Sequence, residues 1–153
     1  MMGVLGVGVW SAVSATTHWR HFDHGSDIGI RGVGRTMAEA FEQAAMALTA
    51  VICDPGSVSA EEVVEVDSDN PDPELLFVDW IDAVVYQVVT RQMLFSRFRV
   101  EMSGDHLHGW LYGEAIDIGR HQPAVEVKGA TLTGLEVRRI EGGHWQAQCV
   151  VDV

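Results

Sequence analysis

The sequence predicts a single α+β domain of two layers, in which two helices pack on one largely antiparallel or mixed β-sheet. Two stretches place apolar residues at helical spacing. Strand-like stretches rich in β-branched and aromatic residues lie before, between and after them, separated by turn residues. With 153 residues, 47% of them hydrophobic, the chain is long enough to bury a core as one domain.

The domain is expected to span residues 18–153, after a flexible N-terminal extension at residues 1–17. The extension holds a short, Gly-rich apolar stretch, Val4 to Trp10, followed by a small-residue segment. A cleaved secretory signal is the alternative, although the positively charged start of such a signal is missing. The stretch is too short to span a bilayer.

The first elements of the domain are two strands, His18 to His24 and Ile28 to Val33, followed by a helix. Thr36 and Glu39 form a capping box, in which the Thr36 hydroxyl accepts from the Glu39 amide and the Glu39 carboxylate reaches back. Apolar residues then follow at helical spacing until the Asp54-Pro55-Gly56 sequence ends the helix.

A short strand, Val63 to Val66, and an acidic, turn-prone run, residues 67–71, precede the second helix. Asp72 is its expected N-cap, with Pro73 in the first turn. Apolar residues surround this helix almost completely, which predicts that it is covered on more than one side.

The rest of the chain, from Ser96, is strand-rich. Its first two strands form a hairpin, and the final strand would place Asp152 at the rim of a sheet. The expected strands are Arg97 to Met102, His106 to Tyr112, Val125 to Lys128, Leu135 to Ile140 and Trp145 to Val151.

The charge balance indicates which partners the protein can bind. There are 10 Lys and Arg against 22 Asp and Glu, a formal net charge of −12. No Lys/Arg cluster is present to neutralise phosphates, so no strong direct nucleic-acid binding is expected. The two cysteines, Cys53 and Cys149, are far apart and outside any CxxC motif, which favours a reduced, cytoplasmic location and no zinc site.

Carboxylates gather at the two ends of the domain. Asp23 and Asp27 flank His24-Gly25-Ser26, and Asp152 stands next to Val153 with its α-carboxylate. Such hard oxygen donors suit Ca²⁺ or Mg²⁺. The alternative for the first segment is a turn with a side-chain cap.

Several separated motifs, in order from about Trp19 to the last residue, together resemble the archease family. They are Asp23 to Gly32, Thr36 to Ala45, Leu75 to Trp80, Gly113-Glu114, Arg120-His121, Val127 to Thr131 and Val151 to Val153. The resemblance implies a small acidic α+β protein without catalytic activity of its own.

The resemblance also implies a function and a metal. Archeases act as cofactors of the RtcB-type RNA ligase, promoting its guanylylation and multiple turnover in tRNA splicing and RNA repair. An older proposal is chaperone-like modulation of tRNA methylation. The family binds a divalent cation, usually described as calcium, at positions that correspond here to Asp27, Asp152 and Val153.

Five further residues are candidates for supporting the metal or contacting the partner: Asp23, His24, Glu114, His121 and Lys128. Lys128 matches a lysine thought to matter for activity in the family, although a solvated strand lysine is the alternative. The two histidines suit hydrogen bonding better than ligation of an all-oxygen calcium site.

The chain departs from the usual family pattern at two places. Gly25-Ser26 replaces a common Thr-Ala and keeps both carboxylates. Leu132-Thr133 replaces a common Tyr-His and weakens any role for a histidine there.

Two other function classes remain open. One is a small metal-dependent hydrolase that activates water with Asp23, Asp27 and His24. The other is a general holdase chaperone, which would expose an apolar patch.

Overall fold

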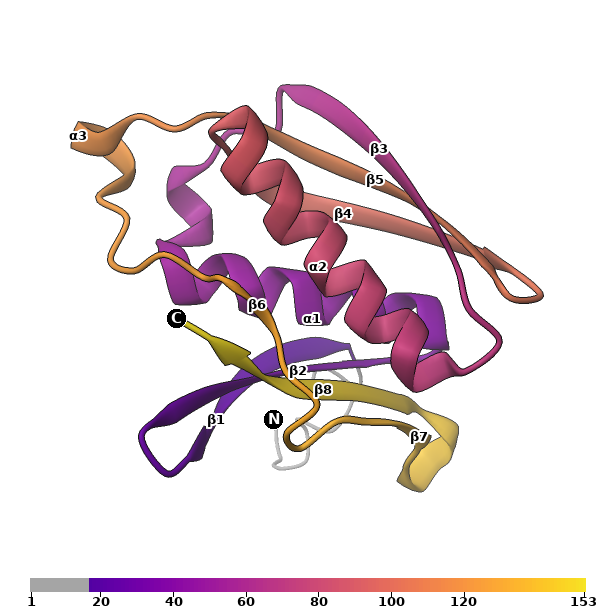
Figure 1. Cartoon of the computed structure of the whole chain (residues 1–153). Helices are drawn as coiled ribbons and strands as arrows, with labels where there is room; N and C mark the ends of the chain where they lie inside the picture. The colour runs from indigo at the N-terminus through magenta and orange to yellow at the C-terminus, as the bar shows by residue number, and fades with distance from the viewer. Residues whose placement is uncertain (1–16) are drawn as a thin grey trace, which may run out of the picture.

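A computed structural model describes residues 17–153 of the chain. The expected N-terminal extension therefore lies outside the described residues, apart from Thr17. Two antiparallel sheets enclose the two long helices, so the described domain has three layers (Figure 1). The α+β class is confirmed.

Sheet A, the lower sheet in Figure 1, contains both ends of the described domain. Its order is β1-β2-β8-β6, and β7 also pairs with β8. Its strands are β1 (His18–His24), β2 (Asp27–Gly34), β6 (Gly129–Ala130), β7 (Glu136–Arg139) and β8 (Trp145–Asp152).

Sheet B comes from the middle of the chain and has the order β3-β5-β4. Its strands are β3 (Glu62–Asp69), β4 (Met93–Ser103) and β5 (His106–Ala115). The predicted hairpin is the β4–β5 pair. Short helical turns, η2 (Pro55–Ser57), α3 (Ile118–His121) and η3 (Glu141–Gly143), lie in the connections.

The sequence pattern predicts one sheet, whereas the structure has two. The reason lies in helix α1 (Met37–Ile52), whose buried residues cover more than half of its circumference, so one sheet cannot cover it. The predicted strand at 125–128 also differs. Of these residues only Val127 is buried, and pairing with β8 begins at Gly129, immediately after the predicted strand ends.

Helix α1 begins as predicted, because the Glu39 amide donates to the Thr36 hydroxyl at 3.1 Å. The reciprocal contact differs from the capping box, since the Glu39 carboxylate accepts from the Arg35 amide at 2.9 Å. The helix lies very close to sheet A. A Cβ on Gly32 would come within 2.1 Å of the Ala40 carbonyl oxygen, so only glycine permits this approach.

Helix α2 (Pro73–Arg91) is capped by Asp72, whose carboxylate accepts from the Glu74 amide at 2.9 Å. It contacts strands of both sheets, which confirms that it is covered on more than one side. Its Trp80 is fully buried and donates its indole N–H to the Phe41 carbonyl of α1 at 2.9 Å. None of the described helices is long and apolar enough to cross a membrane.

Candidate functional site

Asp27 and Asp152 lie at the same rim of sheet A. Gly25, with a φ of 63°, begins the tight turn of the β1–β2 hairpin, and Asp27 is the first residue of β2. Strands β2 and β8 are antiparallel with Ile28 opposite Val151. Asp27 precedes Ile28 and Asp152 follows Val151, so the same register carries the two carboxylates to neighbouring positions on one face of the sheet.

The two carboxylates are exposed, and neither side chain has a hydrogen-bond or ion-pair partner among residues 17–153. Val153, also exposed, follows directly. Like charges held next to each other on adjacent strands repel, and a divalent cation between them removes that repulsion. Hard oxygen donors with free lone pairs therefore fit Ca²⁺ or Mg²⁺.

A hollow of about 480 Å³ adjoins this rim and has Asp152 in its wall. Helix α2 contributes Asp82 and Tyr86 to the wall, and the segment before β6 contributes Lys128. The Lys128 amide donates to the Asp152 carbonyl at 2.7 Å, and Asp82 accepts from the Ala130 amide at 2.8 Å. These bonds fix the chain that carries Lys128 beside the rim.

The other carboxylate of the hairpin, Asp23, lies on its opposite face. Asp23 is opposite Ile28, and His24 is opposite Asp27, so only His24 shares a face with Asp27. Asp23 makes no side-chain hydrogen bond within the described part of the chain, so it does not cap the turn, which was the alternative for this segment. The hydrolase hypothesis requires Asp23 and Asp27 on one ion, and this alternation separates them.

Glu114 and His121 meet in a network of their own. The Glu114 carboxylate accepts from Arg120 and from the Ser59 amide, each at 2.8 Å, and lies 2.9 Å from His121 Nε2. The Arg120 contact, with those of Ser59 and His121, lowers the pKa of Glu114 to about 2. The His121 side chain is fully buried, and its Nδ1 accepts from the Asp117 amide.

Among the described residues, no hydrogen bond or ion pair of the Glu114 network reaches the rim of sheet A. The network instead ties α3 and the turn at Ser59 to the end of β5. Its role in the described structure is therefore to hold these connections together.

A second group of charged residues, which the sequence analysis missed, lies on sheet B. Asp67, His106 and His108 bring one ligand atom each to within 4.8 Å of one another. Residues 67–71 were expected to form a loop, but β3 continues to Asp69 and pairs with β5. The available signal was the alternation of His106 and His108 on a predicted strand.

Comparison with known proteins decides the family. The sequence profile of the Archease protein family (MTH1598/TM1083) matches residues 19–153. The chain belongs to the archease family. The protein archease of Pyrococcus furiosus is 34% identical over 139 residues, covering 88% of this chain and 98% of that protein. The archease of Methanosarcina acetivorans is 35% identical over 140 residues, covering 88% and 95% of the two chains.

Solved structures agree with the fold. The solution structure of protein 1598 from Methanobacterium thermoautotrophicum is similar with a TM-score of 0.77 and 32% identity, covering 88% of this chain and 98% of that one. A crystal structure from Thermotoga maritima, described as an archease and possible chaperone, has a TM-score of 0.60 at 18% identity, covering 88% of this chain and 96% of that one. At that identity the Thermotoga protein shows the shared fold alone.

Proposed function

We propose that this protein is a non-catalytic, metal-binding activator of an RtcB-type RNA ligase, promoting guanylylation and multiple turnover of the ligase in tRNA splicing and RNA repair. Membership of the archease family supports the proposal. The structural observation that carries it is the pairing of β2 with β8, which sets Asp27 beside Asp152 with neither side chain engaged elsewhere in residues 17–153.

The cation, which we take to be Ca²⁺, would be held by the carboxylates of Asp27 and Asp152 and the α-carboxylate of Val153. Three oxygen donors leave further coordination positions of a calcium ion for water or a group of the partner. The ion supplies a fixed positive charge that a donor group of the ligase can bind.

The neighbouring residues of this chain suit a contact with another protein. Lys128 is exposed and lies in the wall of the hollow beside the rim, so its ammonium group is available to pair with an acid of the partner. Tyr86, 63% exposed on the same wall, offers an apolar ring with a polar end, a residue type enriched in protein interfaces. The net charge of −12 favours a basic partner surface over bare RNA.

Multiple-turnover ligation tests the proposal. An RtcB-type ligase from the same organism is assayed with and without this protein, and Ca²⁺ binding is measured in parallel by calorimetry. We expect wild type to stimulate turnover, and Asp152→Asn to lose both calcium binding and stimulation. Asp105→Asn is the matched control, since Asp105 is an exposed aspartate in the β4–β5 turn, and it should behave as wild type.

Two results would contradict different parts of the proposal. Folded wild-type protein that gives no stimulation would remove the ligase as partner. An Asp27→Ala protein that no longer binds metal but activates fully would remove the metal from the mechanism.

A chaperone-like modulator of tRNA-modifying enzymes is the second candidate, and an apolar hollow of about 220 Å³ favours it. Val89, Ile118 and Val125 in its wall are exposed, Ile118 by 70%. Such a surface can bind apolar segments of another protein. Suppression of aggregation of unrelated clients, lost in Ile118→Ser, would favour a general holdase chaperone over ligase activation.

A further inference from the structure

The solvent-facing side of sheet B presents an unusual set of side chains. Strand β3 contributes Glu65, Asp67 and Asp69, while their inward neighbours Val64 and Val66 are buried. Strand β5 contributes His106 and His108 from the adjacent strand, with Asp67 opposite His108 and Asp69 opposite His106. The backbone pairing of two strands therefore places three carboxylates against two imidazoles.

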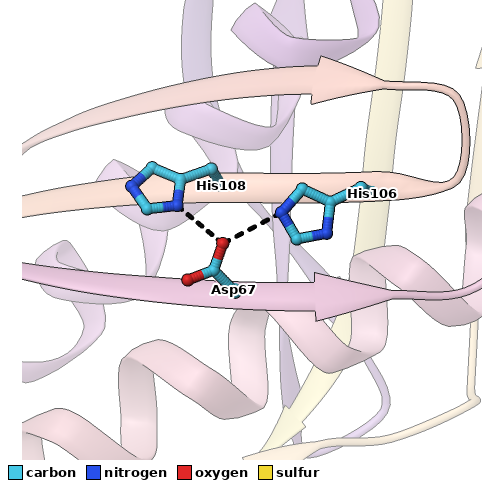
Figure 2. Close-up of side chains that lie close together, drawn as sticks. All are labelled: Asp67, His106 and His108. Carbon is cyan, nitrogen blue, oxygen red and sulfur yellow. Dashed lines mark hydrogen bonds and ion pairs between the residues drawn. The ribbon is translucent and has the colours of Figure 1, made fainter.

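Asp67 lies at the centre of this set (Figure 2). Its Oδ1 is 2.9 Å from His106 Nε2 and 2.6 Å from His108 Nδ1. One carboxylate oxygen thus has an imidazole nitrogen on each side, and all three ligand atoms lie within 4.8 Å of one another. His-x-His on one strand with a carboxylate from the next is a donor set that suits Zn²⁺.

The outer nitrogens of both rings are also bound to carboxylates. His106 Nδ1 is 2.8 Å from Asp69, and His108 Nε2 is 2.7 Å from Glu65. In metal sites, a ligating histidine usually gives its second N–H to a carboxylate, which fixes the tautomer and raises the basicity of the ligand. Both histidines already have that second partner.

We propose that Asp67, His106 and His108 form a Zn²⁺ site, with Asp69 and Glu65 orienting the two imidazoles. The ligands would be His106 Nε2, His108 Nδ1 and an Asp67 oxygen. The side chains of the three ligands are 42%, 28% and 54% exposed, respectively, so water has access to complete a tetrahedral shell. This site is independent of the proposed calcium site on sheet A.

The hydrogen bonds of the cluster are compatible with an exchange of ring protons for Zn²⁺. Without metal, each imidazole lies between two carboxylates, and a ring nitrogen can hydrogen-bond to a carboxylate only while that nitrogen carries a proton. The hydrogen bonds that His106 donates to Asp69, and that His108 donates to Asp67, raise the pKa of each histidine. Zn²⁺ would take the place of the protons on His106 Nε2 and His108 Nδ1.

The nearest charged groups on the third strand are already paired. Glu101 of β4 is opposite His108, but its carboxylate binds Arg99 at 2.6 Å. Arg99 also lies over the Trp110 ring, and that ring packs edge-on against His108 at 4.3 Å between centroids. The edge contact restricts the orientation of the His108 ring, while Arg99 keeps Glu101 from competing for the metal.

Zinc calorimetry on the full chain tests the proposal. We expect one Zn²⁺ per chain, with binding lost in Asp67→Asn and in His108→Gln. Glu65→Gln and Asp69→Asn should each weaken binding by about tenfold, because they remove only an orienting partner. Asp152→Asn and His24→Gln, which change the other candidate metal site and an exposed histidine elsewhere, should leave zinc binding unchanged.

Imidazole nitrogen resonances give a second readout that does not depend on variants. On addition of ZnCl₂ at pH 7, His106 should bind through Nε2 and His108 through Nδ1, so the two rings adopt opposite tautomers. Binding should release about two protons at a pH where both rings are charged. Coordination of both rings through Nε2, or binding that survives His108→Gln, would overturn the proposal.

Discussion

Sheet A and sheet B cover opposite sides of the same two helices but contact them through different kinds of side chain. On sheet A, Gly32 and Gly34 allow the backbone of α1 to lie almost directly on the strands. On sheet B, large side chains such as Phe95, Leu107 and Leu111 fill the space to the helices. The contact of α1 with sheet A requires residues without side chains, whereas the contact of the helices with sheet B requires large side chains. Adding a methyl group should therefore destabilise the first, and removing side-chain atoms should destabilise the second.

The carboxylates of the two sheets differ in a similar way. At the rim of sheet A, Asp27 and Asp152 have no side-chain partners among the described residues. On sheet B, Asp67 has two imidazoles within 3 Å, and Glu114 at the end of β5 has three donors. A carboxylate pair without protein partners is left to water or to a cation from solution, whereas a paired carboxylate is neutralised by the protein itself.

The largest expected effect comes from removing volume on sheet B. Leu111 is fully buried in the core, so Leu111→Ala should lower the free energy of unfolding by about 2–5 kcal/mol. Urea unfolding followed by circular dichroism measures it. Leu132→Ala removes the same atoms from a side chain that is 67% exposed, and it should change stability by no more than about 0.5 kcal/mol.

Adding volume on sheet A is the reciprocal test, with a somewhat smaller effect. Gly32→Ala places a methyl group against the α1 backbone and should cost about 1–3 kcal/mol, since the helix must move away. Gly119→Ala is the control, because its Cβ meets only Asp117 at an ordinary 3.6 Å. Equal stability of the two variants would refute the close approach of α1 to sheet A.

The smallest effect concerns the paired carboxylate Glu114 and depends on pH. Its pKa is lowered to about 2 from an ordinary 4.5, so its contribution to stability is present above pH 4.5 and is lost as the pH falls toward 2. Glu114→Gln should therefore be less stable than wild type at pH 7 and equal to it near pH 2. Urea midpoints between pH 2 and 7 measure the convergence.

Neutralising an unpaired carboxylate should have the opposite effect on stability. Asp152→Asn removes like-charge repulsion at the rim, so in metal-free buffer it should not lose stability at pH 7. A loss equal to that of Glu114→Gln would mean that Asp152 also has a structural partner.

Local signals in the sequence were sufficient for most single elements. The caps at Thr36 and Asp72, the hairpin between β4 and β5, and the final strand, which extends one residue beyond its predicted end to Asp152, are all present. Each depends on residues close together in the chain. The α+β class follows from these elements.

What the sequence could not provide was pairing between distant segments. The division into two sheets depends on the side of α1 on which each strand lies, and no local pattern in the sequence indicates that side. The Asp67, His106 and His108 cluster requires β3 to extend through an acidic segment that resembles a turn and then to pair with β5. Glu114 and His121 were candidates for supporting the metal or contacting the partner, and no local pattern indicated that Arg120 and Ser59 bind Glu114 in a network of its own.

The position of β8 has a consequence for how quickly the protein folds. β8 lies inside sheet A, with β2 on one side and β6 and β7 on the other, and Arg31 bonds Gln148 across 117 positions. Such distant contacts close loops at a high entropic cost and slow folding. Sheet B, built from a hairpin and one earlier strand, can form first. Until β8 arrives, β2 is an open edge that exposes Ile28 and Ile30 to other chains, so this interval is the time of greatest aggregation risk.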